Sequence, residues 1–175
     1  MAFEELRVGF ETGNLVLLRR IGAGAMGTVW LAEHRTLRTR VAVKFVTEEL
    51  LLGDPVALER FAREAEILAR LKSPHIVQVL DRAMTNSGVP YLVMELLEGE
   101  TLSRHLARRG PTSLAIVRRV VEHVAKALTK AHALGVVHRD IKPDNIFLAR
   151  TDEGLVCKVV SASARQASSQ GRSPG

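Results

Sequence analysis

A cluster of glycines near the N-terminus has the composition and spacing of a phosphate-binding turn. The segment from Gly22 to Val29 fits the pattern G-x-G-x-x-G-x-V. Glycine lets a backbone turn tightly and approach phosphate oxygens without a side chain in the way. Dinucleotide-binding folds share part of this pattern, but there the glycines open directly into a helix, whereas Thr28–Leu31 has the residues of a strand. The segment therefore predicts a hairpin over a nucleotide, with an ordinary glycine-rich hairpin as the alternative.

Lys44 and Glu64 are the second candidates for chemistry. Lys44 ends a strand-like run that begins at Val41, and its flexible ammonium can neutralise phosphate charge; a solvent-facing lysine is the alternative. On a helical wheel of residues 55–72, Glu64 falls inside the apolar arc, whereas Glu66 falls on the opposite, charged face. Because a carboxylate on a buried face needs a cation, we predict that Lys44 pairs with Glu64.

The third and strongest candidate is the run His138-Arg139-Asp140-Ile141-Lys142-Pro143-Asp144-Asn145. It follows the glycine that ends a long predicted helix and precedes a strand-like segment at 146–148, so a polar turn is the simpler alternative. Three elements precede this run along the chain: the glycine segment, the strand that ends at Lys44 and the helix that carries Glu64. The run is the fourth element of this ordered set. In these elements the chain resembles the catalytic domain of eukaryotic-type (Hanks-type) serine/threonine protein kinases, over roughly residues 10–160, and we expect a bacterial member.

The resemblance implies a catalytic role for five residues. Asp140 would accept or orient the proton of the attacking hydroxyl, and Lys142 would offset charge at the transferred phosphate. Asn145 would offer its amide oxygen to Mg²⁺, a hard cation that prefers oxygen ligands. Lys44 and Glu64 would form the charged pair of the nucleotide site. A lysine at position 142 is typical of kinases that act on Ser or Thr hydroxyls and not on Tyr.

The resemblance also implies the ligands of the chain, which are ATP, Mg²⁺ and a protein substrate with a Ser or Thr acceptor. Met94 would be the gatekeeper, and the hinge that follows would bind adenine through its backbone. His138 and Arg139 would be structural. The residues expected to bind the nucleotide are Ile21, Gly22, Ala23, Gly24, Ala25, Met26, Gly27, Thr28, Val29, Ala42, Lys44, Met94, Glu95 and Leu97.

The sequence departs from the family after Val160. Ser161-Ala162-Ser163 stand where the family has Asp-Phe-Gly, so the aspartate that would chelate the catalytic Mg²⁺ is absent. We therefore interpret the chain as a truncated catalytic domain with little activity, and a frameshift, a truncation or true divergence would each explain it. A non-catalytic nucleotide-binding module (a pseudokinase) and a gene remnant are the alternatives.

The elements that must position these residues divide the chain into a strand-rich part and a helical part. Strands are predicted within 15–47 and at 76–84 and 89–96, and helices at 55–72, 101–109 and 113–134. This order predicts an α+β, two-lobed kinase-like fold. The small lobe, an antiparallel sheet with one helix, would span 10–97 and a partial large lobe 98–160. The segment 161–175 has no apolar side chain larger than alanine, so we expect disorder.

Composition narrows the function classes further. The chain has 175 residues, 46% of them hydrophobic and 25% charged, in the proportions of a globular protein. Its net charge of +6 lies in the second part, because residues 101–175 carry 13 basic and 5 acidic side chains. No aromatic residues interleave the paired arginines, which favours a solvated face over a nucleic-acid site. One cysteine excludes an intrachain disulfide. No apolar run suffices for a membrane helix, and we expect a cytoplasmic protein.

Overall fold

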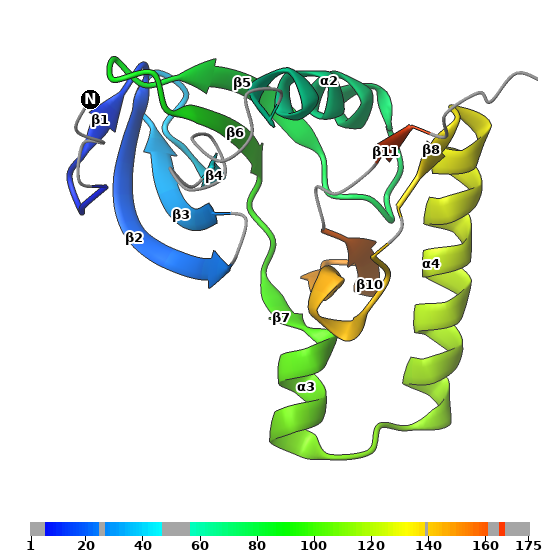
Figure 1. Ribbon diagram of the computed structural model, residues 1–175. Helices are drawn as coiled ribbons and strands as arrows, with labels where there is room; N and C mark the ends of the chain where they lie inside the picture. Colours follow the sequence, from blue (N-terminus) through cyan, green and yellow to red (C-terminus); the bar gives the residue numbers. More distant parts are fainter. Residues whose placement is uncertain (1–5, 25–26, 47–56, 139, 161–164, 167–175) are drawn as a thin grey trace, which may run out of the picture. The chain divides into compact units, whose positions relative to one another are not determined.

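The computed structural model describes residues 6–24, 27–46, 57–138, 140–160 and 165–166, which belong to two compact units (Figure 1). Unit 1 comprises Met1–Arg70 and Val77–Glu98, and unit 2 comprises Leu71–Ile76 and Gly99–Gly175. The chain therefore contributes to unit 2 twice, briefly after its first described helix and again from Gly99 onward.

The described part of unit 1 is an antiparallel sheet with one helix. The strand order is β1-β2-β3-β4-β6-β5, and the helix α2 (Ala57–Arg70) packs against β5. The strands are β1 (Glu11–Thr12), β2 (Leu15–Gly24), β3 (Gly27–His34), β4 (Thr39–Val46), β5 (Val79–Met84) and β6 (Pro90–Glu95). The α+β class with an antiparallel sheet is confirmed, although β5 begins three residues later than the predicted strand at 76–84.

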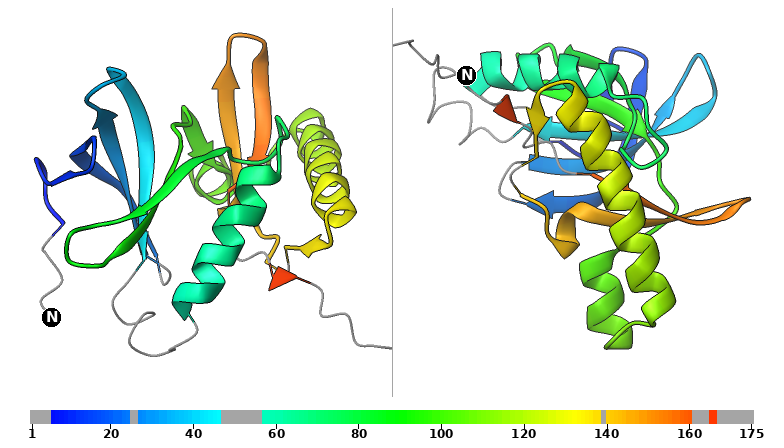
Figure 2. Two further views of the ribbon diagram at one scale, coloured as in Figure 1. Left: turned by 90° about the horizontal axis from the view of Figure 1, so that it is seen from above. Right: turned by 90° about the vertical axis from the view of Figure 1, so that its right-hand side faces the viewer.

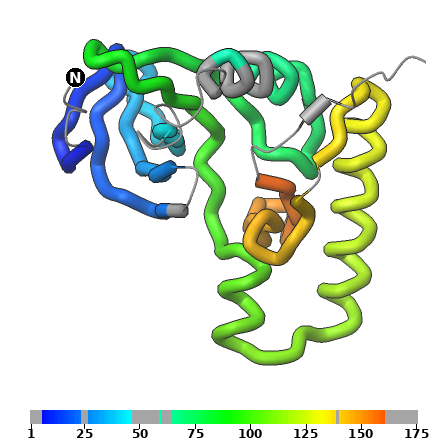
Figure 3. Tube along the Cα trace, in the orientation of Figure 1, coloured from blue at the N-terminus to red at the C-terminus, as the bar shows by residue number. Residues whose placement is uncertain are grey.

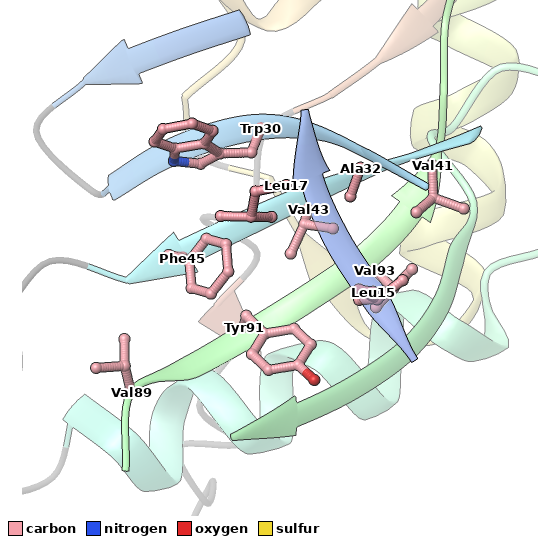
Figure 4. Close-up of a cluster of buried hydrophobic side chains, with 10 residues drawn as sticks. All are labelled: Leu15, Leu17, Trp30, Ala32, Val41, Val43, Phe45, Val89, Tyr91 and Val93. Carbon is pink, nitrogen blue, oxygen red and sulfur yellow. The ribbon is translucent and has the colours of Figure 1, made fainter. Parts of the chain in front are cut away.

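Alternation along the strands separates the core of unit 1 from its predicted nucleotide face. Phe45 is 1% exposed, and its ring centroid lies 5.3 Å from that of Tyr91. Because successive side chains of a strand point to opposite faces, Ala42 and Lys44 project to the side opposite Phe45. Figure 4 shows the core side chains, which are Leu15, Leu17, Trp30, Ala32, Val41, Val43, Phe45, Val89, Tyr91 and Val93.

Gly27 occupies a place in the β2–β3 hairpin that no other residue fits. Its φ of 145° lies in the region that favours glycine, and an added Cβ would overlap the backbone oxygen of Phe45 on β4. Gly22 on β2 differs, because an added Cβ there would lie 3.6 Å from Cβ of Val29, an ordinary contact. The hairpin therefore depends on the glycine at position 27 in particular.

We expect Gly27→Ala to destabilise unit 1 by at least about 2 kcal/mol, because it adds backbone strain to a steric overlap. Gly22→Ala is the matched control and should cost less than about 1 kcal/mol. Urea unfolding followed by the fluorescence of Trp30, the only tryptophan of the chain, measures both. Equal unfolding midpoints for the two variants would contradict the assignment.

The described part of unit 2 combines two helices with a small sheet. The helices α3 (Leu102–Arg109) and α4 (Leu114–Ala133) run in opposite directions on either side of a short connection (Figure 3). The hairpin β9 (Ile146–Thr151) and β10 (Gly154–Val159) lies beside α4 (Figure 2), and β7 (Gly99–Thr101) pairs with β9. The strands β8 (Val136–Val137) and β11 (Arg165–Gln166) form a second antiparallel pair. Within the segment 161–175 only these last two residues are described.

Helix boundaries in unit 2 follow local sequence signals. The Thr101 side chain caps α3, accepting from the amide of Arg104, and Ser113 caps α4 in the same way through the amide of Ile116. A side-chain oxygen at this position satisfies one of the amides that a helix start leaves unpaired. At its other end α4 stops before Gly135, whose φ is 71°. The helices predicted at 101–109 and 113–134 are thereby confirmed. No helix among the described residues has the length and apolar content needed to cross a membrane.

Candidate active site

The polar loop after α4 brings three predicted catalytic residues together. It runs from β8 to a 3₁₀ turn at Pro143–Asn145 that leads into β9. Nζ of Lys142 lies 3.1 Å from Oδ2 of Asp140. The amide nitrogen of Asn145 donates to the same carboxylate oxygen at 2.9 Å and to the backbone oxygen of Asp140 at 2.8 Å. Three side chains that the sequence places within six positions thus converge on one carboxylate.

The carboxylate of Asp140 is held in its ionised form. The hydrogen bond from Lys142 lowers the pKa of Asp140, partial desolvation opposes this change, and the bond from Asn145 lowers the pKa further. The side chain is 36% exposed, so an approaching hydroxyl group can reach it. An ionised, accessible carboxylate can accept a hydrogen bond from a hydroxyl and orient it.

His138 supports this loop from the inside. Its ring is buried, and burial lowers its pKa. Nδ1 accepts a hydrogen bond from the backbone amide of Asp140 at 3.3 Å, which favours the tautomer with hydrogen on Nε2. Nε2 is buried and has no hydrogen-bond partner among the described residues. His138 therefore orients Asp140 through the backbone, whereas its neighbour Arg139 lies outside the described residues.

Asn145 is suited to a hard metal ion by the orientation of its amide. The nitrogen is directed at Asp140, which leaves the amide oxygen as the group that can ligate, and Mg²⁺ prefers oxygen ligands. The Asn145 backbone is fixed on both sides, because its amide donates to the oxygen of Lys142 at 2.9 Å and its oxygen accepts from Val160 at 3.0 Å. Among the described residues no group of three or more His, Cys, Asp or Glu side chains gathers as a metal site.

Four of the predicted nucleotide residues of unit 1, namely Val29, Ala42, Lys44 and Met94, share one face of the sheet. Lys44 on β4 lies opposite Val29 on β3 and opposite Leu92 on β6, and Ala42 lies opposite Met94. Partners in register point to the same face, so these side chains form a continuous surface that the β2–β3 hairpin adjoins. In that hairpin Gly22 pairs with Val29, Ala23 with Thr28 and Gly24 with Gly27. Ala25 and Met26 lie outside the described residues, and Ile21 is exposed.

The predicted hinge is anchored at Glu95. Its backbone amide donates to the oxygen of Gln78 at 3.0 Å, and its side-chain oxygen accepts from the amide of Gln78 at 2.8 Å. Met94 is buried, and Leu97 is half-buried. The Glu95 side chain therefore holds this segment to Gln78, and adenine binding by the backbone of the segment stays a prediction.

The partner of Lys44 stays a prediction. Glu64 belongs to α2, but its side chain lies outside the described part of the structure. Glu66, the competing glutamate, is exposed and accepts from Arg82 on β5 at 3.2 Å. This position agrees with the charged face on which the helical wheel placed Glu66.

Sequence reasoning missed an ionic cluster beside the predicted catalytic loop. Glu100 on β7 accepts from Arg108 at 2.6 Å and from His105 at 3.1 Å, both on α3. The bond from Arg108, followed by that from His105, lowers the pKa of Glu100 to about 2. His105 and Arg108 follow Glu100 by five and eight positions, across the junction between a strand and a helix. This spacing matches no recognisable motif. The cluster fastens β7 to α3, which packs on the 3₁₀ turn that holds Asn145.

Comparison with known proteins identifies the family. The family model described as protein kinase domain matches residues 15–167. The chain belongs to the protein kinase domain family. It is 41% identical over 161 residues to the serine/threonine-protein kinase PknH of Mycobacterium tuberculosis, covering 92% of this chain and 25% of the relative. The serine/threonine-protein kinase PknA of the same organism is 43% identical over 152 residues, covering 84% and 35%.

Solved structures agree with this family assignment. The crystal structure of the Mycobacterium tuberculosis PknI kinase domain matches with a TM-score of 0.78 and 31% identity, covering 92% of this chain and 64% of that chain. The kinase-like α+β fold and the bacterial relatives confirm the resemblance seen in the sequence. The chain spans about a quarter to a third of the length of PknH and PknA.

Proposed function

We propose that this chain binds ATP with Mg²⁺ and that its catalytic loop serves transfer of the γ-phosphoryl group to a Ser or Thr hydroxyl of a protein. The observation that carries the proposal is the ionised carboxylate of Asp140, which Lys142 and Asn145 contact within 3.1 Å. Phosphoryl transfer depends on positioning and on charge stabilisation. Within six positions this loop supplies a carboxylate that can accept the hydrogen bond of a hydroxyl, a lysine cation and an amide oxygen that can bind a metal ion.

In this proposal each residue of the loop has one task. Asp140 orients the attacking hydroxyl and accepts its hydrogen bond, and Lys142 offsets negative charge on the moving phosphate. The amide oxygen of Asn145 would hold Mg²⁺, which neutralises phosphate charge when bound. In unit 1, Lys44 would bind phosphate oxygens with Glu64 as its counter-ion, and the β2–β3 hairpin would cover them.

We expect ATP with Mg²⁺ to raise the thermal unfolding temperature of the chain, because a ligand that binds only the folded state stabilises it. Lys44→Met should weaken the affinity for ATP at least about tenfold, since a charged hydrogen bond to phosphate contributes roughly 1.5–3 kcal/mol. Arg40→Met is the matched control, because Arg40 is an exposed cation on the same strand, and it should bind ATP as the unaltered chain does. Absence of an ATP-dependent shift would contradict nucleotide binding.

A second candidate is nucleotide binding without transfer. The residue at position 161 favours it, because a neutral serine follows the strand β10 where the family has its metal-binding aspartate. In that case ATP binding would depend on Lys44, while transfer would be absent. The two candidates therefore predict the same ATP-dependent shift and differ in the transfer assay.

A further inference from the structure

Two histidines far apart in the sequence stack on each other in unit 2. His75 comes from the short segment Leu71–Ile76, and His123 lies in the middle of α4. Their ring centroids are 4.1 Å apart and their planes are inclined by 28°. Both rings are half-buried. No element of the kinase motifs includes either residue, so the proposed function leaves the pair unexplained.

Both rings bind the backbone of the same residue, Cys157 on β10. Nδ1 of His123 accepts a hydrogen bond from the Cys157 amide at 3.1 Å, and Nδ1 of His75 lies 3.4 Å from the Cys157 oxygen. The amide of Val159 donates to the backbone oxygen of His75 at 2.9 Å. In the sheet β10-β9-β7 the strand β10 is an edge. The two imidazoles thus form hydrogen bonds with backbone groups of Cys157 that would otherwise be unpaired on an edge strand.

These contacts fix different tautomers for the two rings. An amide only donates, so Nδ1 of His123 must carry a lone pair and its hydrogen sits on Nε2. A carbonyl oxygen only accepts, so Nδ1 of His75 must carry a hydrogen. A metal ion shared by the two Nε2 atoms is thereby disfavoured, since Nε2 of His123 has no free lone pair. The pair is built to hold β10 and not to hold a metal.

The two rings respond differently to a proton. His75 can take one on Nε2 and keep its donor to Cys157, whereas a proton on His123 must go to Nδ1 and remove the acceptor of the Cys157 amide. Burial and the neighbouring His75 lower the pKa of His123. The charged side chains of α4 that act on His123 are Glu122, Lys126 and Arg119. The other charged side chains of the packed elements are Arg118 and Lys130 on α4, Lys158 on β10 and Lys72 on the short segment. On α4, Glu122 alone is acidic, and it is paired with Lys126 at 2.6 Å.

We propose that His75 and His123 form a proton-sensitive clamp, which holds α4 and the Leu71–Ile76 segment on β10 while His123 is neutral and releases the Cys157 amide when His123 is protonated. The clamp acts whether or not the chain transfers phosphate. It bears on the catalytic loop through β10, because Val160, the residue after that strand, donates to the backbone oxygen of Asn145.

The direction of the pH effect follows from the lowered pKa of His123 in the clamped state. The released state binds a proton at an ordinary histidine pKa of about 6.5, and the clamped state binds it only at lower pH. The clamp is therefore fully formed above about pH 6.5 and weakens as the pH falls below that value. One proton linked to release changes the release equilibrium by up to about tenfold per pH unit.

The tautomers can be tested in the unaltered full chain. Long-range proton–nitrogen NMR correlations of ¹⁵N-histidine at pH 7.5 should show hydrogen on Nε2 of His123 and on Nδ1 of His75. Hydrogen on Nδ1 of His123 would overturn the proposal. This measurement does not require any variant to fold.

Hydrogen exchange of the Cys157 amide tests the release. After correction for the intrinsic pH dependence of exchange, protection in the unaltered chain should fall by up to about tenfold per pH unit below about pH 6.5. His123→Asn keeps an oxygen near the position of Nδ1 and cannot titrate, so its protection should not vary with pH. His132→Asn is the matched control, an exposed histidine on the same helix, and should behave as the unaltered chain. Constant protection in the unaltered chain, or an unchanged pH dependence in His123→Asn, would overturn the clamp.

Discussion

Replacing Ser161 with aspartate should raise the transfer of the γ-phosphoryl group from ATP to a generic Ser/Thr substrate by about a hundredfold or more. A serine at this position offers a neutral hydroxyl where a carboxylate would hold a divalent cation. Losing such an interaction costs several kcal/mol of barrier, and each ~1.4 kcal/mol is a factor of ten in rate. The unaltered chain should therefore transfer little phosphate. Transfer of radiolabel from ATP measures the difference.

Two further variants make this result specific. Ser163→Asp adds the same charge two positions away and should give no increase. Asp140→Asn combined with Ser161→Asp should abolish the gain, because the hydroxyl would lose the carboxylate that orients it. Robust transfer by the unaltered chain that disappears in Asp140→Asn would contradict the prediction, and it would mean that another carboxylate holds the metal.

The second large effect concerns the core beneath the predicted nucleotide face. Phe45→Ala should destabilise unit 1 by about 3–5 kcal/mol, since truncating a buried phenylalanine removes its burial and leaves a cavity. Phe45 is the largest of the fully buried side chains described here and packs on Tyr91. Urea unfolding followed by Trp30 fluorescence measures the loss.

An exposed leucine in the same unit provides the control for this core substitution. Leu37 lies between β3 and β4 and is 66% exposed, so Leu37→Ala should change the free energy of unfolding by less than about 0.5 kcal/mol. A cost below about 1 kcal/mol for Phe45→Ala would mean that Phe45 is not a central core residue.

The features that the sequence predicted well depend on neighbours along the chain. Ser113 and Gly135 mark the ends of α4 through local hydrogen bonding and backbone conformation, and both signals can be read within a few residues. The loop from Asp140 to Asn145 is equally local, so its three side chains could be expected to converge. Glu66 was placed in solvent by helical periodicity alone, and its contact with Arg82 confirms that position.

The features that the sequence did not predict depend on residues far apart in the chain. His75 and His123 are separated by 48 positions, and their stack arises only because α4 and β10 pack together. Strand order has the same origin, since β4 pairs with β6 and not with the intervening β5. The apolar face of α4 is covered only in part. Val120 and Val124 pack on the core of unit 2, whereas Val117 and Val121 are exposed, because a helical wheel cannot say which part of an apolar arc a neighbour covers.

Two separate segments of the chain belong to unit 2. Cutting the chain after Glu98 therefore gives one fragment with a whole unit and one fragment with an incomplete unit. A polypeptide that stops at Glu98 contains every residue of unit 1. One that starts at Gly99 lacks Leu71–Ile76, and with it the bridge between Ile76 and Val159 and the backbone oxygen that receives the Val159 amide. Proteolysis between Glu98 and Gly99 would thus leave a C-terminal piece with an unsatisfied strand edge. A synthetic peptide of residues 71–76, added in trans, is the natural reagent to repair it.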